Sequence, residues 1–273
     1  MEIQFVKVSP NQNMTLLIET PIAREKQLEI AKTLIAYHSV YAEQAGYIEQ
    51  PKNKKALARL QMMAGEFCGN ATLALATYLF AKEQPPAFSK KIIPLEVSGA
   101  DDIVYCHIQK TQQHFMGTLE MPLPLCVEQK QYVLHDKSYL LETVCFAGIW
   151  HIIVPKSLWG ANATDYAQQA ANAWGNQIDA EAFGILIWDE TTKELQSLVC
   201  VKNASLIWER GCGSGTSAIG IVTALQQKSN IALDIQQTGG IMHIAVTYEK
   251  NKISHIQLSV PIAIVAKGTA YIP

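Results

Sequence analysis

The sequence predicts an α/β (α+β) protein of two similar, pseudo-twofold-related domains, each a curved strand barrel around one central apolar helix. The main observation is an internal repeat, in which residues 68–74 (CGNATLA) match residues 212–218 (CGSGTSA) across an offset of 144 residues, about half of the 273-residue chain. A repeat of half the chain length indicates duplicated domains and not a solenoid of short units.

The second observation is the character of the helices that follow the two repeated segments. Residues 71–80 and 216–225 contain good helix formers and almost no polar face. A helix that is apolar on all sides is buried on all sides. We therefore expect each domain to wrap its strands around one central helix that begins directly after a Cys-Gly pair.

The remaining elements follow from hydrophobic patterning. Residues 27–37 carry apolar side chains at helical spacing and predict an amphipathic helix. Pro122 and Pro124 interrupt the pattern near the middle of the chain, and we place the domains at residues 1–118 and 119–260. Short apolar runs predict strands at residues 3–8, 16–18, 103–108, 133–134, 152–154, 198–201, 241–246 and 256–258.

Composition excludes several classes of protein. The formal net charge is −2, with 49% hydrophobic and 17% charged residues, which favours a folded core over disorder. A nearly neutral chain has no electrostatic footprint for nucleic acid or anionic membranes. Its apolar stretches are shorter than the roughly 20 residues that span a bilayer, and its first residues do not resemble a signal peptide. We expect a cytoplasmic protein with neither nucleic acid nor membrane as a partner.

The six cysteines give no sign of a metal site. None forms a Cys-x-x-Cys pair, and no two histidines have the close spacing of a zinc-binding helix. Neither a dinucleotide fingerprint nor a pyridoxal-phosphate lysine is recognisable, so we expect no cofactor and no metal. Four cysteines are interpreted as small buried hydrophobes, namely Cys106, Cys126, Cys145 and Cys200.

Cys68 and Cys212 stand where each central helix begins. Unpaired backbone N–H groups and the helix dipole favour negative charge there, so we expect each thiol to have a lowered pKa. A thiolate on one side of a carbon centre and a thiol on the other form the base and the acid needed to invert an amino-acid α-carbon. The competing interpretations are helix caps with incidental cysteines and a redox pair, which we regard as an inactive state.

The two corners resemble the diaminopimelate epimerase-like superfamily of cofactor-independent racemases and epimerases. Within that superfamily the chain most resembles the histidine racemases of staphylopine-type opine metallophore pathways. The similarity extends over essentially the whole chain, and it rests on residues 13–15 (NMT), 43–44 (EQ), 66–72 (EFCGNAT), 206–209 (LIWE), 212–216 (CGSGT) and 270–272 (AYI).

The resemblance implies specific roles. Cys68 and Cys212 are the two acid/base residues, and the terminal segment 261–273 returns to the first domain. Glu43 and Glu209 are candidates to contact the amino group or side chain of the substrate. The amino-acid head group is bound by Asn13, Gly69, Asn70, Gly213, Ser214 and Gly215.

Departures from the diaminopimelate epimerase pattern suggest the substrate. Asn203 and Ala204 stand where those epimerases carry a Glu-Arg pair, and residues 148–151 (GIWH) replace Gly-Asn-Pro-His. Losing charged anchors and gaining an aromatic side chain favours a flat side chain such as imidazole over a second zwitterionic end. We expect interconversion of L- and D-histidine for opine metallophore synthesis.

Two alternatives stay open. One is a diaminopimelate epimerase or a racemase for another amino acid. The other is a non-catalytic amino-acid-binding protein on the same scaffold, in which two thiols at matched positions would have no purpose. In each case the partner is a small amino acid, and a homodimer is one assembly that the sequence allows.

Overall fold

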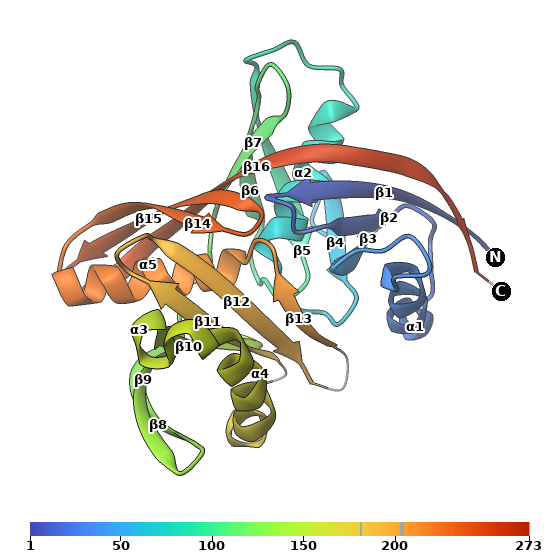
Figure 1. Cartoon of the computed structure of the whole chain (residues 1–273). Helices are drawn as coiled ribbons and strands as arrows, with labels where there is room; N and C mark the ends of the chain where they lie inside the picture. The colour runs from blue at the N-terminus through green and yellow to red at the C-terminus, as the bar shows by residue number, and fades with distance from the viewer. Residues whose placement is uncertain (181, 203–204, 273) are drawn as a thin grey trace. The chain divides into compact units, whose positions relative to one another are not determined.

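A computed structural model describes residues 1–180, 182–202 and 205–272. The chain divides into two compact units, one made of residues 1–120 and 259–273, the other of residues 121–258. Each unit contains strands packed around an apolar helix, as the sequence predicts (Figure 1). The boundary falls next to the two prolines, Pro122 and Pro124.

The first unit is a closed ring of strands. Their order is β1-β2-β3-β4-β5-β6-β7-β16, and β16 also pairs antiparallel with β1, which closes the ring. The elements are β1 (Glu2–Pro10), β2 (Thr15–Ile18), α1 (Arg24–Ile35), β3 (Gln44–Glu49), β4 (Ala58–Met62), α2 (Gly69–Ala81), β5 (Lys90–Val97), β6 (Val104–Lys110), β7 (Phe115–Glu120) and β16 (Lys252–Tyr271), whose second half belongs to this unit.

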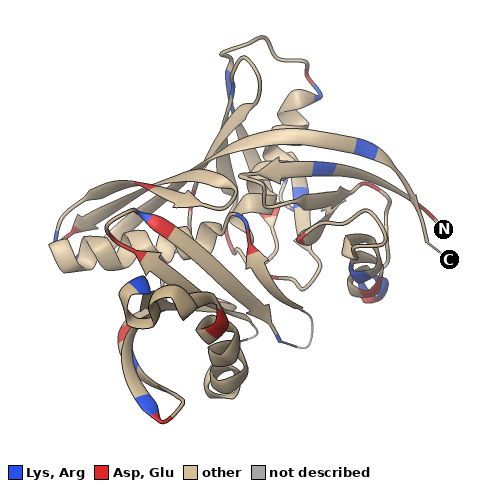
Figure 2. Ribbon diagram, in the orientation of Figure 1, with Lys and Arg blue, Asp and Glu red and all other residues tan. Residues whose placement is uncertain are grey.

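Helix α2 is the centre of the first unit. All of its residues are buried except Leu79 and Ala81, and it packs against strands β1 to β7. The helix carries no charged residue, whereas the surface helix α1 carries charges of both signs (Figure 2). On β7, a Cβ on Gly117 would lie 2.5 Å from the Ile262 Cδ1 atom and 3.0 Å from the Leu73 Cδ2 atom, so the absent side chain lets α2 approach the strands.

The second unit also packs its strands around one helix, but its strand order differs at β8 and β13. Its strand order is β8-β9-β10-β11-β12-β14-β15-β16, with β13 added to β12. The elements are β8 (Cys126–Leu134), β9 (Lys137–Phe146), β10 (Ile149–Pro155), α3 (Lys156–Trp159), α4 (Ala163–Trp174), β11 (Ala182–Asp189), β12 (Glu194–Val201), β13 (Ser205–Glu209), α5 (Gly213–Gln227), β14 (Ile231–Gln237), β15 (Gly240–Glu249) and the first half of β16, with short 3₁₀ turns at Gly160–Asn162 and Gly175–Gln177.

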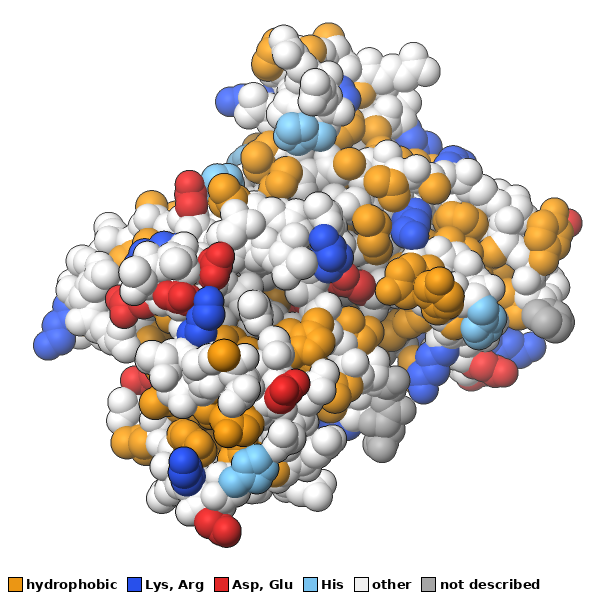
Figure 3. Space-filling model, in the orientation of Figure 1, with side chains coloured by type: hydrophobic (Ala, Val, Ile, Leu, Met, Phe, Trp, Pro, Cys, Tyr) orange, Lys and Arg blue, Asp and Glu red, His pale blue; other side chains and the backbone are white. Residues whose placement is uncertain are grey.

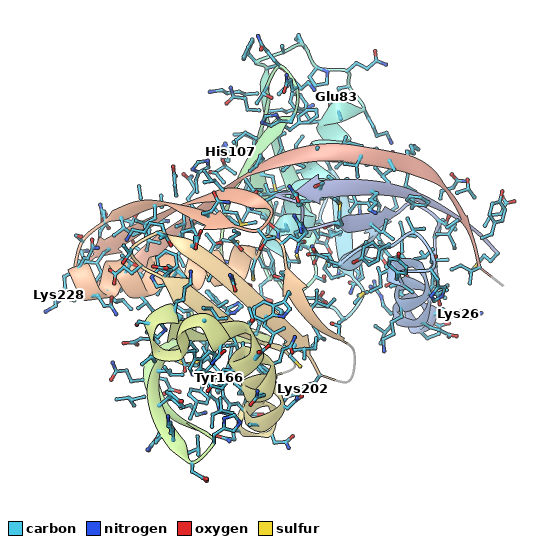
Figure 4. The ribbon with its side chains drawn as sticks, viewed as in Figure 1. Lys26, Glu83, His107, Tyr166, Lys202 and Lys228 are labelled. Carbon is cyan, nitrogen blue, oxygen red and sulfur yellow. A yellow bond between two sulfur atoms is a disulfide. The ribbon has the colours of Figure 1, made fainter. Side chains whose placement is uncertain are left out.

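Helix α5 is the counterpart of α2. It is largely buried against β9, β10, β11, β14 and β15, and it ends where Lys228 adopts the left-handed conformation (Figure 4). Gly220 allows close contact with β15, because a Cβ there would lie 2.9 Å from the Ile244 Cγ1 atom. The apolar pattern of residues 216–225 therefore predicted both the helix and its burial correctly.

Two features of the second unit differ from expectation. Cys126 and Cys145 are opposite each other in the β8–β9 pair, with Cα atoms 5.1 Å apart, and form a disulfide. Interpreting them as unpaired hydrophobes was wrong, because strand register decides which cysteines meet. Helix α4 was also missed. Its Trp174 is completely buried, and Tyr166, labelled in Figure 4, makes an edge contact with Trp159.

The surface agrees with the balanced composition. On the face drawn in Figure 3, basic and acidic side chains are scattered among hydrophobic and polar ones. Among the described residues, none of the helices combines the length and the apolar character that a membrane span requires.

Candidate active site

Cys68 is the N-cap residue of α2 in the first unit. Its sulfur accepts a hydrogen bond from the Ala71 backbone N–H at 3.4 Å, while its thiol donates to the Gln44 Oε1 atom at 3.1 Å. The Thr72 hydroxyl donates to the Cys68 carbonyl at 2.7 Å and fixes the corner from the helix side. The thiol is thus held at the positive end of a buried helix.

A polar network around Cys68 fixes the side-chain amide of Gln44, which accepts the hydrogen bond of the thiol. The Gln44 Nε2 group donates to the Asn13 Oδ1 atom at 2.6 Å and to the Thr15 hydroxyl at 2.9 Å, which leaves Oε1 facing the thiol. Asn13 in turn donates to the Glu43 Oε2 atom at 2.6 Å. The structure therefore brings together Asn13, Glu43 and Cys68, three of the predicted site residues, and Gly69 and Asn70 follow in the first turn of α2.

Cys212 is the N-cap residue of α5 in the second unit. Its sulfur accepts from the Gly215 N–H at 3.3 Å, the same geometry as at Cys68. A Cβ on Gly215 would lie 3.1 Å from this sulfur and 2.9 Å from the Leu186 Cδ2 atom. A side chain at this position would therefore push the Gly215 N–H away from the Cys212 sulfur. The predicted residues Gly213, Ser214 and Gly215 all lie in this first helical turn.

Gln237 fixes the second corner through the backbone of Cys212, whereas Gln44 contacts the thiol of Cys68. Its Oε1 atom accepts from the Cys212 backbone N–H at 2.8 Å, and its Nε2 group donates to the Thr216 hydroxyl at 2.7 Å. That hydroxyl donates to the Cys212 carbonyl at 2.7 Å. Neither glutamine was predicted as a site residue, because a single amide side chain on a strand carries no recognisable sequence pattern.

The pKa of the Cys212 thiol is raised, whereas the sequence predicts a lowered pKa. Burial raises the pKa of the Cys212 thiol well above its ordinary value, and the neighbouring Glu209 carboxylate raises it further. The Gly215 N–H and the Ser214 hydroxyl lower the pKa, but they do not outweigh these two effects. The expectation of a lowered pKa was wrong for Cys212, whose side chain is 2% exposed.

The carboxyl group of Glu209 forms a hydrogen bond with the thiol of Cys212. Burial raises the pKa of its carboxyl group to about 7, although its hydrogen bond with Cys212 opposes the shift. A carboxylate that titrates near neutrality can take the thiol proton and return it, which suits acid/base chemistry at physiological pH. Glu209, predicted as a contact for the substrate, thus also interacts with Cys212.

We predict that Glu209→Gln lowers the pKa of Cys212 by about one unit or more, because a like charge next to the thiolate disappears. The measurement is the pH dependence of iodoacetamide alkylation at Cys212, followed by peptide mass spectrometry. Glu194→Gln, at an exposed position of β12, is the matched control. A profile that stays in place, or that moves to higher pH, contradicts this electrostatic account.

One group of side chains has the composition of a metal site. Among the described residues, Cys126, Glu128 and Cys145 bring their ligand atoms within 4.8 Å of one another. The two sulfur atoms are joined in the disulfide, so they present no thiolates to an ion. Asn203 and Ala204, predicted to stand in place of the Glu-Arg pair of diaminopimelate epimerases, lie outside the described residues.

Solved structures resemble this fold at low sequence identity. A hydroxyproline epimerase from Agrobacterium vitis, solved with trans-4-OH-L-proline, has a TM-score of 0.74 at 10% identity over 98% of this chain and 92% of that one. A probable proline racemase from Agrobacterium radiobacter has a TM-score of 0.72 at 12% identity over 99% and 93%. These similarities establish the racemase-type fold.

Sequence relatives are closer. The chain is 28% identical to a histidine racemase of Staphylococcus aureus, over 99% of this chain and 98% of the relative. It is 27% identical to a histidine racemase of Fusobacterium nucleatum, over 99% and 97%. The family model described as the histidine racemase CntK N-terminal domain matches residues 2–271. The chain therefore belongs to the histidine racemase family, as the resemblance of its two Cys-Gly corners predicted.

Proposed function

We propose that this protein is a cofactor-independent racemase that interconverts L- and D-histidine, with Cys68 and Cys212 as its acid/base pair. The observation that carries the proposal is the matched geometry of the two corners. Each cysteine caps a buried helix, and each sulfur accepts the backbone N–H three residues further on. The names of the relatives in Staphylococcus and Fusobacterium support histidine as the substrate.

In the proposed reaction, one sulfur removes the α-hydrogen as a proton and the other delivers a proton to the opposite face. The C–H electron pair stays on the α-carbon as a carbanion until the second thiol protonates it. At Cys212, Glu209 accepts the thiol proton and so generates the thiolate. At Cys68, the sulfur keeps its proton, which is hydrogen-bonded to the Gln44 Oε1 atom, until the S–H bond breaks and the proton passes to the α-carbon.

Head-group binding uses the helix ends. Backbone N–H groups at the start of α2 and α5 are suited to the substrate carboxylate, and they stabilise the charge that it gains as the carbanion forms. We assign this role to Gly69, Asn70, Gly213, Ser214 and Gly215. Glu43 and Asn13, joined by a hydrogen bond of 2.6 Å, supply an acceptor for the ammonium group.

The cellular setting is part of the same proposal. We assign the protein to the cytoplasm, where D-histidine would serve opine metallophore synthesis, and we propose a homodimer as its assembly. Fractionation and size-exclusion chromatography with light scattering test these two assignments.

The proposed activity is tested with purified protein, L-histidine and chiral chromatography. We expect the D to L ratio to approach one without added pyridoxal phosphate or metal, and a chelator to leave the rate unchanged. A rate that depends on a bound cofactor, or L-histidine that stays unconverted while another amino acid racemises, overturns the proposal.

A further inference from the structure

We propose that Ser98 is a positioning residue for Cys68 and that its hydroxyl holds the backbone segment that leads into the Cys68 corner. This inference rests on the proposed function for the catalytic role of Cys68. Ser98 directly follows β5 and is buried, with 5% of its surface exposed. Its hydroxyl donates to the Glu66 carbonyl at 2.9 Å and accepts from the Met62 backbone N–H at 2.9 Å.

These two hydrogen bonds fix both ends of one loop. Met62 is the last residue of β4, and Glu66 stands two residues before Cys68. Residues 64–65 between them are exposed, so little packing is available to hold the loop. A serine hydroxyl can donate once and accept at the same time, which allows it to join a carbonyl to an N–H group. Ser98 therefore connects the end of β4 to the segment before the cysteine.

Gly99 brings the same turn against this segment. Its φ is +72°, and a Cβ there would lie 2.3 Å from the Phe67 backbone nitrogen and 2.7 Å from the Glu66 carbonyl carbon. A side chain at this position would displace the backbone that precedes Cys68. On the helix side, the Thr72 hydroxyl holds the Cys68 carbonyl. The backbone of the cysteine is thus fixed from both directions.

The second unit holds the equivalent carbonyl with a different donor. In each unit two antiparallel strands follow the central helix, β5 and β6 after α2, and β14 and β15 after α5 (Figure 1). Between β14 and β15, the Gly239 N–H donates to the Arg210 carbonyl at 2.7 Å. Arg210 stands two residues before Cys212, which is the position of Glu66 in the first corner. The recurrence indicates that each corner requires a fixed carbonyl at this position.

The expected effect on catalysis follows from the geometry of proton transfer. A reacting group that is misplaced by about 1 Å can lose about 10²-fold in rate. Ser98 holds backbone that precedes the acid/base residue, so its loss should displace the Cys68 sulfur relative to the α-carbon. Several N–H groups share the proposed head-group binding, and we therefore expect kcat to fall while KM changes little.

The kinetic test compares three variants by chiral chromatography, with circular dichroism to confirm folding. We expect Ser98→Ala to lower kcat about tenfold with KM within about twofold of the wild type. Ser98→Thr keeps a hydroxyl and should retain most of kcat. Ser259→Ala is the matched control, because it removes a serine hydroxyl of the same unit that lies 2.7 Å from the Thr118 hydroxyl, and it should leave kcat unchanged.

Hydrogen exchange followed by mass spectrometry gives a second measurement that does not require turnover. In Ser98→Ala we expect the amides of residues 62–68 to exchange about tenfold faster, because local opening of the loop becomes easier. Residues 209–215, at the Cys212 corner of the same molecule, are the internal control and should be unaffected. A merely general loss of stability would accelerate exchange at both corners.

Four results overturn the proposal: an unchanged kcat in Ser98→Ala, an equal loss in Ser259→Ala, an equal loss in Ser98→Thr, or equal acceleration of exchange at both corners. If Ser98→Ala does not fold, NMR exchange of the Met62 N–H in the wild type replaces it. Strong protection supports the hydrogen bond to Ser98, and exchange as fast as that of an exposed amide contradicts it. If this bond is present and histidine is not racemised, only the proposed function fails.

Discussion

Replacing either Cys68 or Cys212 by serine is expected to reduce histidine racemisation by about 10³-fold or more while the protein remains folded. Serine keeps the size of the side chain and its ability to cap the helix, but its hydroxyl is far less acidic than a thiol. Without one sulfur, a proton is exchanged on one face only and the cycle cannot close. The measurement is kcat for each variant by chiral chromatography, with circular dichroism to confirm folding.

Cys200→Ser is the matched control for this experiment. Cys200 is a free, half-buried cysteine of β12 in the second unit, and it does not lie at the start of a helix. We expect this variant to retain most of the wild-type rate. Racemisation at the wild-type rate by Cys68→Ser or Cys212→Ser would rule out the two-thiol mechanism.

Histidine is expected to exceed LL-diaminopimelate in kcat/KM by about 10³-fold or more. A second zwitterionic end needs counter-charges in the site, because an unpaired buried charge is strongly destabilising. In an alignment without a gap, the neutral residues Asn203 and Ala204 stand where diaminopimelate epimerases carry their Glu-Arg pair, and Ile149 supplies no side-chain amide. Lost polar partners discriminate far more strongly than apolar fit does.

A panel of L-amino acids together with LL-diaminopimelate tests this preference. If diaminopimelate turns over more efficiently than histidine, the assignment of substrate fails and the two-thiol mechanism survives. If several unrelated amino acids turn over equally well, the protein is a broad-specificity racemase. Turnover of none, with tight binding of one, favours the non-catalytic alternative.

The features predicted correctly from sequence are those with a strong local signal. The apolar patterns of residues 71–80 and 216–225 identified α2 and α5, and the repeated Cys-Gly segments located both helix starts. Ser214 and Gly215 could be placed in the first turn of α5 because they directly follow Cys212 and Gly213 in the sequence. The burial of a whole helix can be predicted from sequence because none of its faces carries a charged side chain.

The features missed from sequence depend on the tertiary fold and not on a local pattern. Gln44 and Gln237 reach their cysteines from separate strands, at sequence separations of 24 and 25 residues. The raised pKa of Cys212 comes from burial and from Glu209, neither of which a helix N-terminus reveals. The Cys126–Cys145 disulfide depends on the register of β8 and β9, which no local pattern fixes.

The most direct test of the two-thiol account is the fate of deuterium when L-histidine racemises in D₂O. At low conversion, NMR and mass spectrometry of the separated enantiomers show which face of the α-carbon exchanges with solvent. Two thiols on opposite faces predict that D-histidine carries one α-deuterium while the remaining L-histidine keeps its α-hydrogen. Deuterium that appears in L-histidine as fast as in D-histidine would indicate a single base and contradict the account.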